Sequence, residues 1–477
     1  MLQKVVARAS PLALIYAFEL GLPAVRMVIF SHFLDLRELG FASLLAALYG
    51  TLEQVTDVAM YKFVLSTPRE DYEEAVASAH ALSVARGLIV GLLALAAAPF
   101  VAQAFQLGAE WPSFAAVGLV AFIRSFEHLE PRVAERDYHY GSQAKVVGVA
   151  NGFGLAAIAV GVALRLGANA LILSLLAQSL SFVVCSALVS KTRYRLRFRS
   201  PFFKRAFTFG YPLMINGVGV AAGSQADRYL VGAMLSLPAL GLYSVLTLAI
   251  NVPMSIVMRT VQVLSMAALF NARRDERMFA ARLRLASLVV PAVAGFLAAG
   301  VLTLMNYVVP LVFGPKFVAS RTMVFLLAFT AFVRLVRNDP GTSLLLTEGR
   351  TRRLALANLF VVGGLLFSIV FIYFWRTIEA SVAGRLTAEF MGLIAMHCLA
   401  GVAFRGIGRF NLLVIAAVAA AIAALCAILC LLPHGGNLTG NLALLAACTT
   451  GLSLLLSRFA PALASVAFTG FGTPTEG

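Results

Sequence analysis

The sequence predicts an all-α polytopic membrane protein. The 477-residue chain is 60% hydrophobic and only 13% charged, and its mean hydropathy is +0.89. A typical soluble domain carries about 25% charged residues. Apolar segments that could cross a bilayer as helices, which takes roughly 20 residues, recur along the whole chain. We therefore expect about fourteen transmembrane helices, with little mass outside the membrane.

The expected spans fall into two sets of six and a final pair, with boundaries good to a few residues. The first set lies near residues 11–33, 40–62, 82–102, 112–131, 146–165 and 168–190. The second set lies near 209–234, 241–270, 285–313, 321–347, 354–375 and 381–404. The last pair lies near 412–432 and 440–458.

Two short stretches share a pattern that indicates an internal duplication. Arg26 is followed 14 residues later by Gly40, within Leu-Gly-Phe-Ala-Ser, and Arg228 is followed 13 residues later by Gly241, within Leu-Gly-Leu-Tyr-Ser. A match this short could arise by chance, but each copy lies at the start of one half of the chain. Six expected spans separate the copies, so both cross the membrane in the same direction. This predicts two six-helix bundles related by a pseudo-two-fold axis along the membrane normal, with a cavity between them.

The expected domains follow from this duplication. We expect an N-terminal six-helix bundle over residues 1–190, a basic cytoplasmic linker over 191–208 and a C-terminal six-helix bundle over 209–404. Residues 405–477 would add two extra helices and a cytoplasmic tail. The linker carries seven basic residues between Lys191 and Arg205. They could bind anionic membrane lipids, but we favour their interpretation as a stop-transfer signal and linker between the two repeats.

The distribution of basic residues predicts the orientation of the chain. The formal net charge is +16. Most Lys and Arg residues fall in the termini and in alternate loops, which places both termini in the cytoplasm. The expected location is the cell inner membrane. In a soluble protein such a charge would suggest nucleic acid. Here it reports topology, and we expect no nucleic-acid partner.

Seven arginines fall within the expected spans, where each would cost about 3 kcal/mol if it faced lipid. Two of them have an acid within one helical turn: Arg124 can reach Glu127, and Arg385 can reach Glu389. We interpret these two as structural ion pairs. The other five have no acid at that spacing, and we predict that they line a cavity for an anionic substrate: Arg26, Arg228, Arg259, Arg334 and Arg337. Pairing with acids on other helices is the alternative, for which the candidates are Glu19, Glu53, Asp57, Asp227 and Asp339.

Several residues are candidates for ion coupling or gating. Asn338-Asp339-Pro340-Gly341 interrupts an expected span, and a proline removes a backbone donor there. Such a break is either a hinge or ion site of a transporter or a tolerated kink. The full set of coupling or gating candidates is Glu19, Asp57, Asp227, Asp339 and Pro340. The coupling force would be H⁺, Na⁺ or the membrane potential.

The sequence offers no sign of catalysis or of a bound cofactor. It contains no HExxH, Walker A or GxSxG pattern. All five cysteines lie in apolar runs without paired spacing, which favours small core residues over disulfides or metal ligands. We therefore predict no enzyme, no catalytic residue and no metal site.

The stretch FGYPLMINGVGVAAGSQADRYLVGAMLSLPALGLYS, its partner around Arg26, the basic linker and the two six-helix halves resemble a known family. They are similar to the polysaccharide-unit flippases (Wzx type) of the multidrug/oligosaccharidyl-lipid/polysaccharide exporter superfamily. The resemblance implies two helical bundles in a V around a cationic cavity. It also implies that a lipid-pyrophosphate-linked oligosaccharide is moved to the outer leaflet by alternating access. Cavity arginines of the family correspond best to Arg26 and Arg228, and less closely to Arg259.

The same resemblance implies a role in lipopolysaccharide or exopolysaccharide synthesis, beside a polysaccharide polymerase and other assembly proteins. The two extra C-terminal spans are similar to those of the lipid II flippase branch, whereas twelve helices are commoner among polysaccharide flippases. Two other functions stay open. One is a cation-coupled drug exporter of the same superfamily. The other is a membrane polysaccharide polymerase or glycosyltransferase, for which the loops are short.

Overall fold

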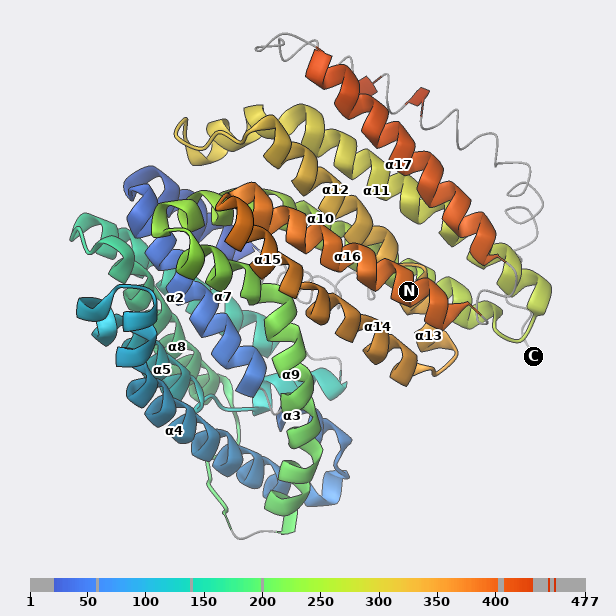
Figure 1. The fold of residues 1–477 in the computed structure, drawn as a ribbon. Coiled ribbons are helices and arrows are strands. Elements are labelled where there is room, and N and C mark those ends of the chain that lie inside the picture. Colours follow the sequence, from blue (N-terminus) through green and yellow to red (C-terminus); the bar gives the residue numbers. More distant parts are fainter. Residues whose placement is uncertain are drawn as a thin grey trace. The chain divides into compact units, whose positions relative to one another are not determined.

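The computed structural model describes residues 21–56, 60–137, 140–198, 201–401, 407–431, 445–446 and 450–451. Within these residues every regular element is a helix (Figure 1). Eight of the helices are long and apolar enough to cross a membrane. The all-α polytopic class is thus confirmed. The count of fourteen stays a prediction, and the expected span near 440–458 lies largely outside the described residues.

The chain divides into two compact units, residues 1–244 and 245–477. This boundary falls inside a long helix. It groups residues by their contacts, whereas the expected domains group them by the internal duplication. The expected domain boundaries therefore stay a prediction. We describe each unit by itself.

Unit 1 begins with a helix over residues 21–33. Its further helices are α2 (Leu36–Thr56), α3 (Met60–Ser66), α4 (Tyr72–Ala104), α5 (Trp111–Arg124), the short α6 (Glu130–Val133), α7 (Gly141–Ala163), α8 (Ala170–Val189), α9 (Pro201–Met234) and the first turns of α10 (Leu237–Ala272). Four 3₁₀ turns join them: η1 (Arg69–Asp71), η2 (Gly108–Glu110), η3 (Ala134–Asp137) and η4 (Gly167–Asn169). Helices α4 and α5, α7 and α8, and α2 and α9 pack in pairs.

Unit 2 holds the rest of α10 and the later helices. These are α11 (Glu276–Phe313), α12 (Arg321–Asn338), α13 (Gly341–Thr347), α14 (Thr351–Gly364), α15 (Leu366–Trp375), α16 (Ile378–Ala400) and α17 (Gly408–Leu431). Helix α16 packs against α12, α14 and α15, and α11 packs against α12 and α17. Helix α16 is therefore the central element of this unit.

Local sequence signals explain where several of these helices begin and end. Asp275, Ser320 and Thr377 precede α11, α12 and α16, and each accepts a hydrogen bond from a backbone N–H of the first turn. Such caps satisfy donors that a helix start leaves open. The expected span at 321–347 is broken where Pro340 was expected to interrupt it: α12 ends at Asn338 and α13 begins at Gly341.

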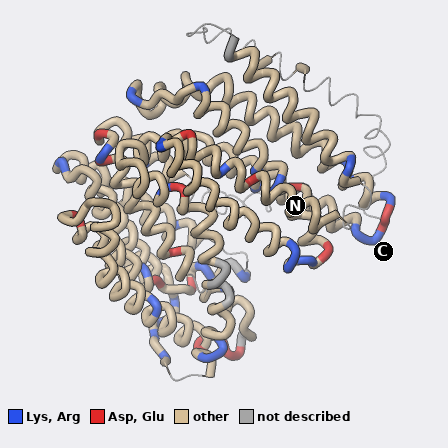
Figure 2. The backbone as a smooth tube through the Cα atoms, viewed as in Figure 1, with Lys and Arg blue, Asp and Glu red and all other residues tan. Residues whose placement is uncertain are grey.

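Charged side chains gather at helix ends and loops, and most of each helix length carries none (Figure 2). This is the distribution that a bilayer imposes, because its hydrocarbon core disfavours charge. Bulky apolar side chains such as Leu93, Phe100 and Leu188 are exposed along α4 and α8, as lipid-facing residues would be. The exceptions to this pattern are the charged residues buried within each unit, which form the candidate site.

The two copies of the Leu-Gly pattern contact each other reciprocally within unit 1. Gly40 is the fifth residue of α2, and Gly241 is the fifth residue of α10. A Cβ on Gly40 would lie 1.9 Å from the carbonyl oxygen of Leu237, the first residue of α10. A Cβ on Gly241 would lie 2.3 Å from the carbonyl oxygen of Leu36, the first residue of α2. Equivalent atoms of the two copies thus meet around a local pseudo-two-fold axis, which favours the duplication over chance.

Replacing Gly40 by Ala tests this contact. No side chain fits without moving backbone, and overpacking of this kind costs about 1–3 kcal/mol. We expect a lower Tm of the detergent-solubilised protein, measured by the thermal shift of native fluorescence. Gly152→Ala is the control, because Gly152 is also helical and a Cβ there would meet nothing within 4 Å. Equal Tm values for the two variants would contradict the close approach.

Candidate functional site

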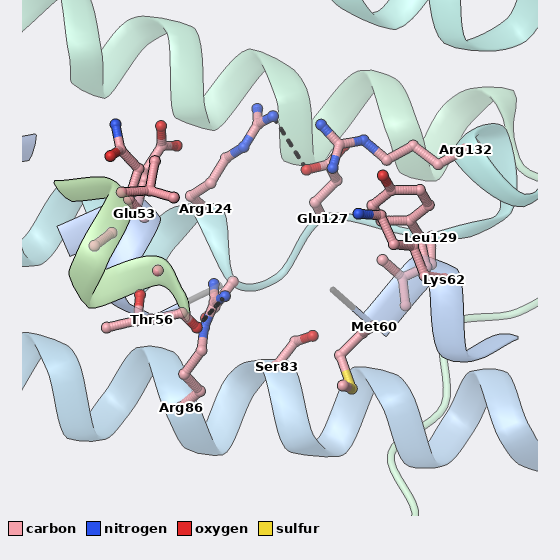
Figure 3. Close-up of a pocket in the computed structure, with 16 residues that line it drawn as sticks. Glu53, Thr56, Met60, Lys62, Ser83, Arg86, Arg124, Glu127, Leu129 and Arg132 are labelled. Carbon is pink, nitrogen blue, oxygen red and sulfur yellow. Dashed lines mark hydrogen bonds and ion pairs between the residues drawn. The ribbon is translucent and has the colours of Figure 1, made fainter. Parts of the chain in front are cut away.

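Unit 1 contains a cavity of about 460 Å³ with a strongly charged lining. Glu53 and Thr56 at the end of α2 line it beside Lys62 of α3. Ser83 and Arg86 of α4 close a second side (Figure 3). Arg124 at the end of α5, Arg132 of α6, and Glu127 and Leu129 between those helices form a third side. Gly217 and Val220 of α9 complete the lining.

One carboxylate holds two guanidinium groups at this cavity. Glu127 lies 3.2 Å from Arg124 Nη2 and 3.7 Å from Arg132 Nε. Arg124 also lies over the ring of Phe182, 3.2 Å from its centroid, which adds a cation–π contact. Arg86 donates to the backbone oxygen of Thr56. The expected structural pair of Arg124 and Glu127 is therefore confirmed, but it forms part of a cavity wall rather than of a sealed interior.

The charge balance of this lining favours an anion. Four basic side chains, Lys62, Arg86, Arg124 and Arg132, face two acidic ones, Glu53 and Glu127. The Nη1 group of Arg124 is buried and makes no hydrogen bond among the described residues. Guanidinium donors that point into a partly enclosed cavity can bind phosphate or carboxylate oxygens through paired hydrogen bonds.

Arg26 is buried in a polar cluster of unit 1. Its Nη2 donates to Gln178 of α8 at 2.7 Å, and Gln178 donates in turn to Asn151 of α7 at 2.6 Å. Glu53 and Tyr49 of α2 lie within electrostatic range of the guanidinium. Glu53 also lines the cavity, so this one residue connects Arg26 with the charged wall described above.

Arg228 is half-buried on α9 in the same compact unit as Arg26. Its Nη1 donates to Gln225, one turn earlier, at 2.8 Å. The adjacent Asp227 accepts from Tyr243 at 3.0 Å, a residue of the second Leu-Gly copy. The duplication predicted one arginine on each half of the chain. In the structure both side chains belong to unit 1, because α9 packs against α2.

Unit 2 contains a second buried charge cluster, centred on Glu389 of α16. This fully buried carboxylate lies 2.7 Å from Arg337 Nε and 3.0 Å from Arg385 Nη2, and 4.0 Å from Arg334 Nε. Asn358 accepts from Arg337, and Asn251 accepts from Arg334. The expected pair of Arg385 with Glu389 is confirmed. Arg334 and Arg337, which have no acid at helical spacing, share the same carboxylate from α12.

The candidate coupling residues occupy different positions. Asp339 is 1% exposed between α12 and α13, where it accepts from the Ser343 hydroxyl, and its peptide bond to Pro340 is cis. Arg259 is exposed on α10, about 12 Å along the axis from Asn251. Glu19 and Asp57 lie outside the described residues.

Sequence reasoning missed part of the cavity wall. Lys62, Arg86 and Arg132 were not among the predicted site residues, because they come from three different helices whose packing the sequence does not show. Arg132 lies five residues after Glu127, so the two are close in sequence. This spacing differs from the three or four residues that bring side chains together on a helix, and it therefore did not predict their contact. The shared use of Glu389 was also missed, since it depends on the packing of α12 against α16.

Solved structures share this fold. The chain matches one described as "Lipid II flippase MurJ, inward closed conformation" with a TM-score of 0.62 and 12% identity, over 96% of this chain and 100% of that one. It also matches an inward-facing "multidrug resistance MATE family transporter of the MOP superfamily" with a TM-score of 0.57 and 16% identity, over 84% of this chain and 95% of that one. The search of curated proteins found no match.

The apolar helices and the shared fold thus define a multi-pass membrane protein. A family model described as "Polysaccharide biosynthesis protein" matches residues 29–322, more than half of the chain. The chain belongs to that family. The resemblance drawn from the sequence is therefore confirmed at the level of family and fold.

Removing the Glu389 carboxylate should leave three neighbouring guanidinium groups without their shared counter-charge. Breaking a buried ion pair costs about 3–5 kcal/mol, so Glu389→Gln should lower Tm by several degrees. Glu276→Gln, at an exposed position in the first turn of α11, is the matched control and should change Tm little. A Tm of Glu389→Gln within one degree of the control would show that the cluster does not depend on this charge.

Proposed function

We propose that the protein is a flippase that moves a lipid-pyrophosphate-linked oligosaccharide from the inner to the outer leaflet of the cell inner membrane by alternating access. The cargo would be a repeat unit for lipopolysaccharide or exopolysaccharide synthesis. The family and the fold support a lipid-linked cargo in a polysaccharide pathway. The observation that supports a negatively charged cargo is the cavity of unit 1, where Arg124 and Arg132 share one carboxylate.

The chemistry of this lining suits a pyrophosphate better than a sugar or a cation. A pyrophosphate presents several oxygens that planar guanidinium forks can bind in pairs. An excess of two basic side chains is a mismatch for a cationic drug, which would require acids instead. The basic lining therefore disfavours the drug-exporter alternative, although a solved structure of that kind shares the fold.

The arginines predicted from the sequence would act together with this wall. Arg26 and Arg228 both belong to unit 1. An anion bound by one of them could therefore reach the other without a conformational change in unit 2. Arg259, Arg334 and Arg337 would supply further cationic surface on unit 2. In this proposal Glu389 holds the forks of Arg334 and Arg337 in place.

Coupling needs no resident cofactor in this proposal. Asp339 is the strongest candidate for a proton or Na⁺ site among the described residues, because it is almost fully buried at a helix break and accepts from a hydroxyl. A change in its charge would act directly on the joint between α12 and α13. Asp227 would have a gating role through its contact with Tyr243. A polysaccharide polymerase and other assembly proteins would be its functional partners.

Transport of the intact cargo is the direct test of this function. Purified protein in liposomes should move a fluorescent lipid-pyrophosphate-linked oligosaccharide between leaflets, measured by its accessibility to a membrane-impermeant quencher. The mass of the lipid should stay the same. New glycosidic bonds formed by the purified protein alone would favour the polymerase alternative, and export of a cationic dye in place of the lipid would favour a drug exporter.

Two arginine variants test the anion site in the same assay. The Arg26→Ala/Arg228→Ala double variant should abolish transport while expression stays near normal, and the corresponding Lys variants should reduce it partially because they keep charge but lose the fork. Arg37→Ala is the control, since Arg37 is an exposed arginine of the same unit. Full transport by the double variant would show that both residues have only a structural role.

Topology is tested independently of transport. A reporter that is active only in the cytoplasm should be active when fused after Arg205, and one that is active only after export should be active when fused near Pro433. The expected orientation rests on the excess of basic residues in alternate loops. The reverse pattern at the two positions would overturn the proposed orientation, and with it the cytoplasmic placement of the linker.

A further inference from the structure

The first part of the basic linker, residues 191–198, is held against unit 1 by specific contacts. Glu130 of α6 accepts from the backbone N–H groups of Lys191 and Thr192 and from the Thr192 hydroxyl. The Arg197 backbone N–H donates to the oxygen of Ala77 on α4. Two surface ion pairs, Arg195 with Glu73 and Arg197 with Glu74, also join the linker to α4.

Three aromatic rings form the centre of this attachment. The ring of Tyr194, from the linker, stacks on His80 of α4 with centroids 4.3 Å apart. His128 meets His80 edge-on at 4.8 Å. His80 is 0% exposed and His128 is 2% exposed. Two imidazoles are thus packed against each other beneath a residue of the linker.

The hydrogen bonds identify both rings as neutral. The backbone N–H of Leu129 donates to His80 Nε2 at 3.1 Å, and that of Glu130 donates to His128 Nδ1 at 3.2 Å. A ring nitrogen that accepts a hydrogen bond cannot carry a proton, so neither ring is an imidazolium. The linker backbone also interacts with both rings, at Arg195 for His80 and at Thr192 for His128. The other two ring nitrogens, His80 Nδ1 and His128 Nε2, are buried and make no hydrogen bond of normal geometry among the described residues.

We propose that His80 and His128 form a proton-operated latch that keeps the linker attached to unit 1 when they are neutral and releases it when they are protonated. Protonation would replace each accepted N–H bond by a clash of two donors, at Leu129 and at Glu130. It would also place two positive charges about 5 Å apart in a buried site. Both effects disfavour the attached linker and leave the released linker unchanged.

The titratable groups nearest the two rings, Tyr194 and Glu130, keep one protonation state in the range where histidine titrates. Burial raises the pKa of Tyr194 to about 12, so its hydroxyl stays protonated. Although burial acts in the opposite direction, the hydrogen bonds from Thr192 and Lys191 hold the pKa of Glu130 below its usual value, so its carboxylate stays ionised. The other charged groups nearby, Glu73, Glu74, Arg195 and Arg197, form the surface ion pairs of the linker. Helix α8 contributes an uncharged contact, the Ser186 hydroxyl beside the His128 backbone.

The sign of the pH effect follows from linkage. Burial lowers the pKa of His128, so the attached state binds fewer protons than the released one. Attachment is at full strength above the ordinary histidine pKa of about 6.5 and weakens as pH falls below it. Between pH 7.5 and pH 5.5, each histidine can change the equilibrium constant for release of the linker by at most a factor of about ten. The limit for the pair is therefore about 100-fold.

The latch also bears on the cavity of unit 1. The segment that carries its backbone donors, Leu129 and Glu130, is continuous with Glu127 and Arg132 of the cavity wall. Ser83 of the wall lies one turn after His80 on α4. Release of the linker would therefore loosen the segment that positions the Glu127 carboxylate.

Limited trypsin digestion of the detergent-solubilised protein tests the latch without any transport assay. Trypsin should cut the linker after Lys191 to Arg197 only when it is released. The exposed turn at Arg273 and Arg274 is an internal reference, so the ratio of the two cutting rates cancels the effect of pH on the protease. We expect this ratio to rise by more than tenfold, up to about 100-fold, from pH 7.5 to pH 5.5.

The His80→Gln/His128→Asn double variant keeps an amide oxygen as acceptor in each site but cannot titrate, so its ratio should stay flat. His128→Asn alone should retain a rise of at most about tenfold. Tyr194→Phe keeps both histidines and the stacked ring, and should show the full rise. A wild-type ratio that rises tenfold or less, or the same rise in either histidine variant as in the wild type, would overturn the two-histidine latch. These results do not depend on what the protein transports.

Discussion

The structure depends on how a mostly apolar chain accommodates guanidinium groups in its interior. An arginine facing lipid costs about 3 kcal/mol on an insertion scale. Among the described residues, five arginines share carboxylates, whereas Arg26 and Arg228 donate to glutamine side chains. Glu127 holds Arg124 and Arg132 in unit 1, and Glu389 holds three arginines in unit 2. A one-to-one pair would neutralise itself. Sharing leaves each cluster positively charged and holds its donors in place, as the proposed anion site requires.

Close helix packing makes this sharing possible. The carboxylate of Glu389 reaches arginines on α12 only because α16 packs closely against that helix. In unit 1 the reciprocal approach of Gly40 and Gly241 brings the starts of α2 and α10 into backbone contact. Small residues at helix contacts are the usual means of close packing in membranes, where no hydrophobic force drives helices together. The same duplication thus supplies an arginine and a packing glycine in each copy.

The sequence was sufficient for the class, the family and the local ion pairs, and insufficient for everything set by packing between helices. Hydropathy and the repeat need only the order of residues, and so do Arg124 with Glu127 and Arg385 with Glu389, which lie within one helical turn. The partner of Arg337 is 52 residues away, and no spacing rule connects them. Arg228 was assigned to the second half of the chain by the duplication, yet α9 packs against α2, and only the three-dimensional arrangement shows this.

The two polar systems of unit 1 differ in a way that separates their functions. In the cavity the charged side chains line partly open space, which suits the proposed binding and release of a charged molecule. In the histidine cluster the titratable groups are neutral, fully packed and tied to backbone N–H groups, so they are suited to respond to protons. The segment between α5 and α6 belongs to both, because Glu127 points to the cavity while Leu129 and Glu130 contact the histidines. In the proposed latch, a displacement at one end of this short segment would reach the other through only two residues of backbone.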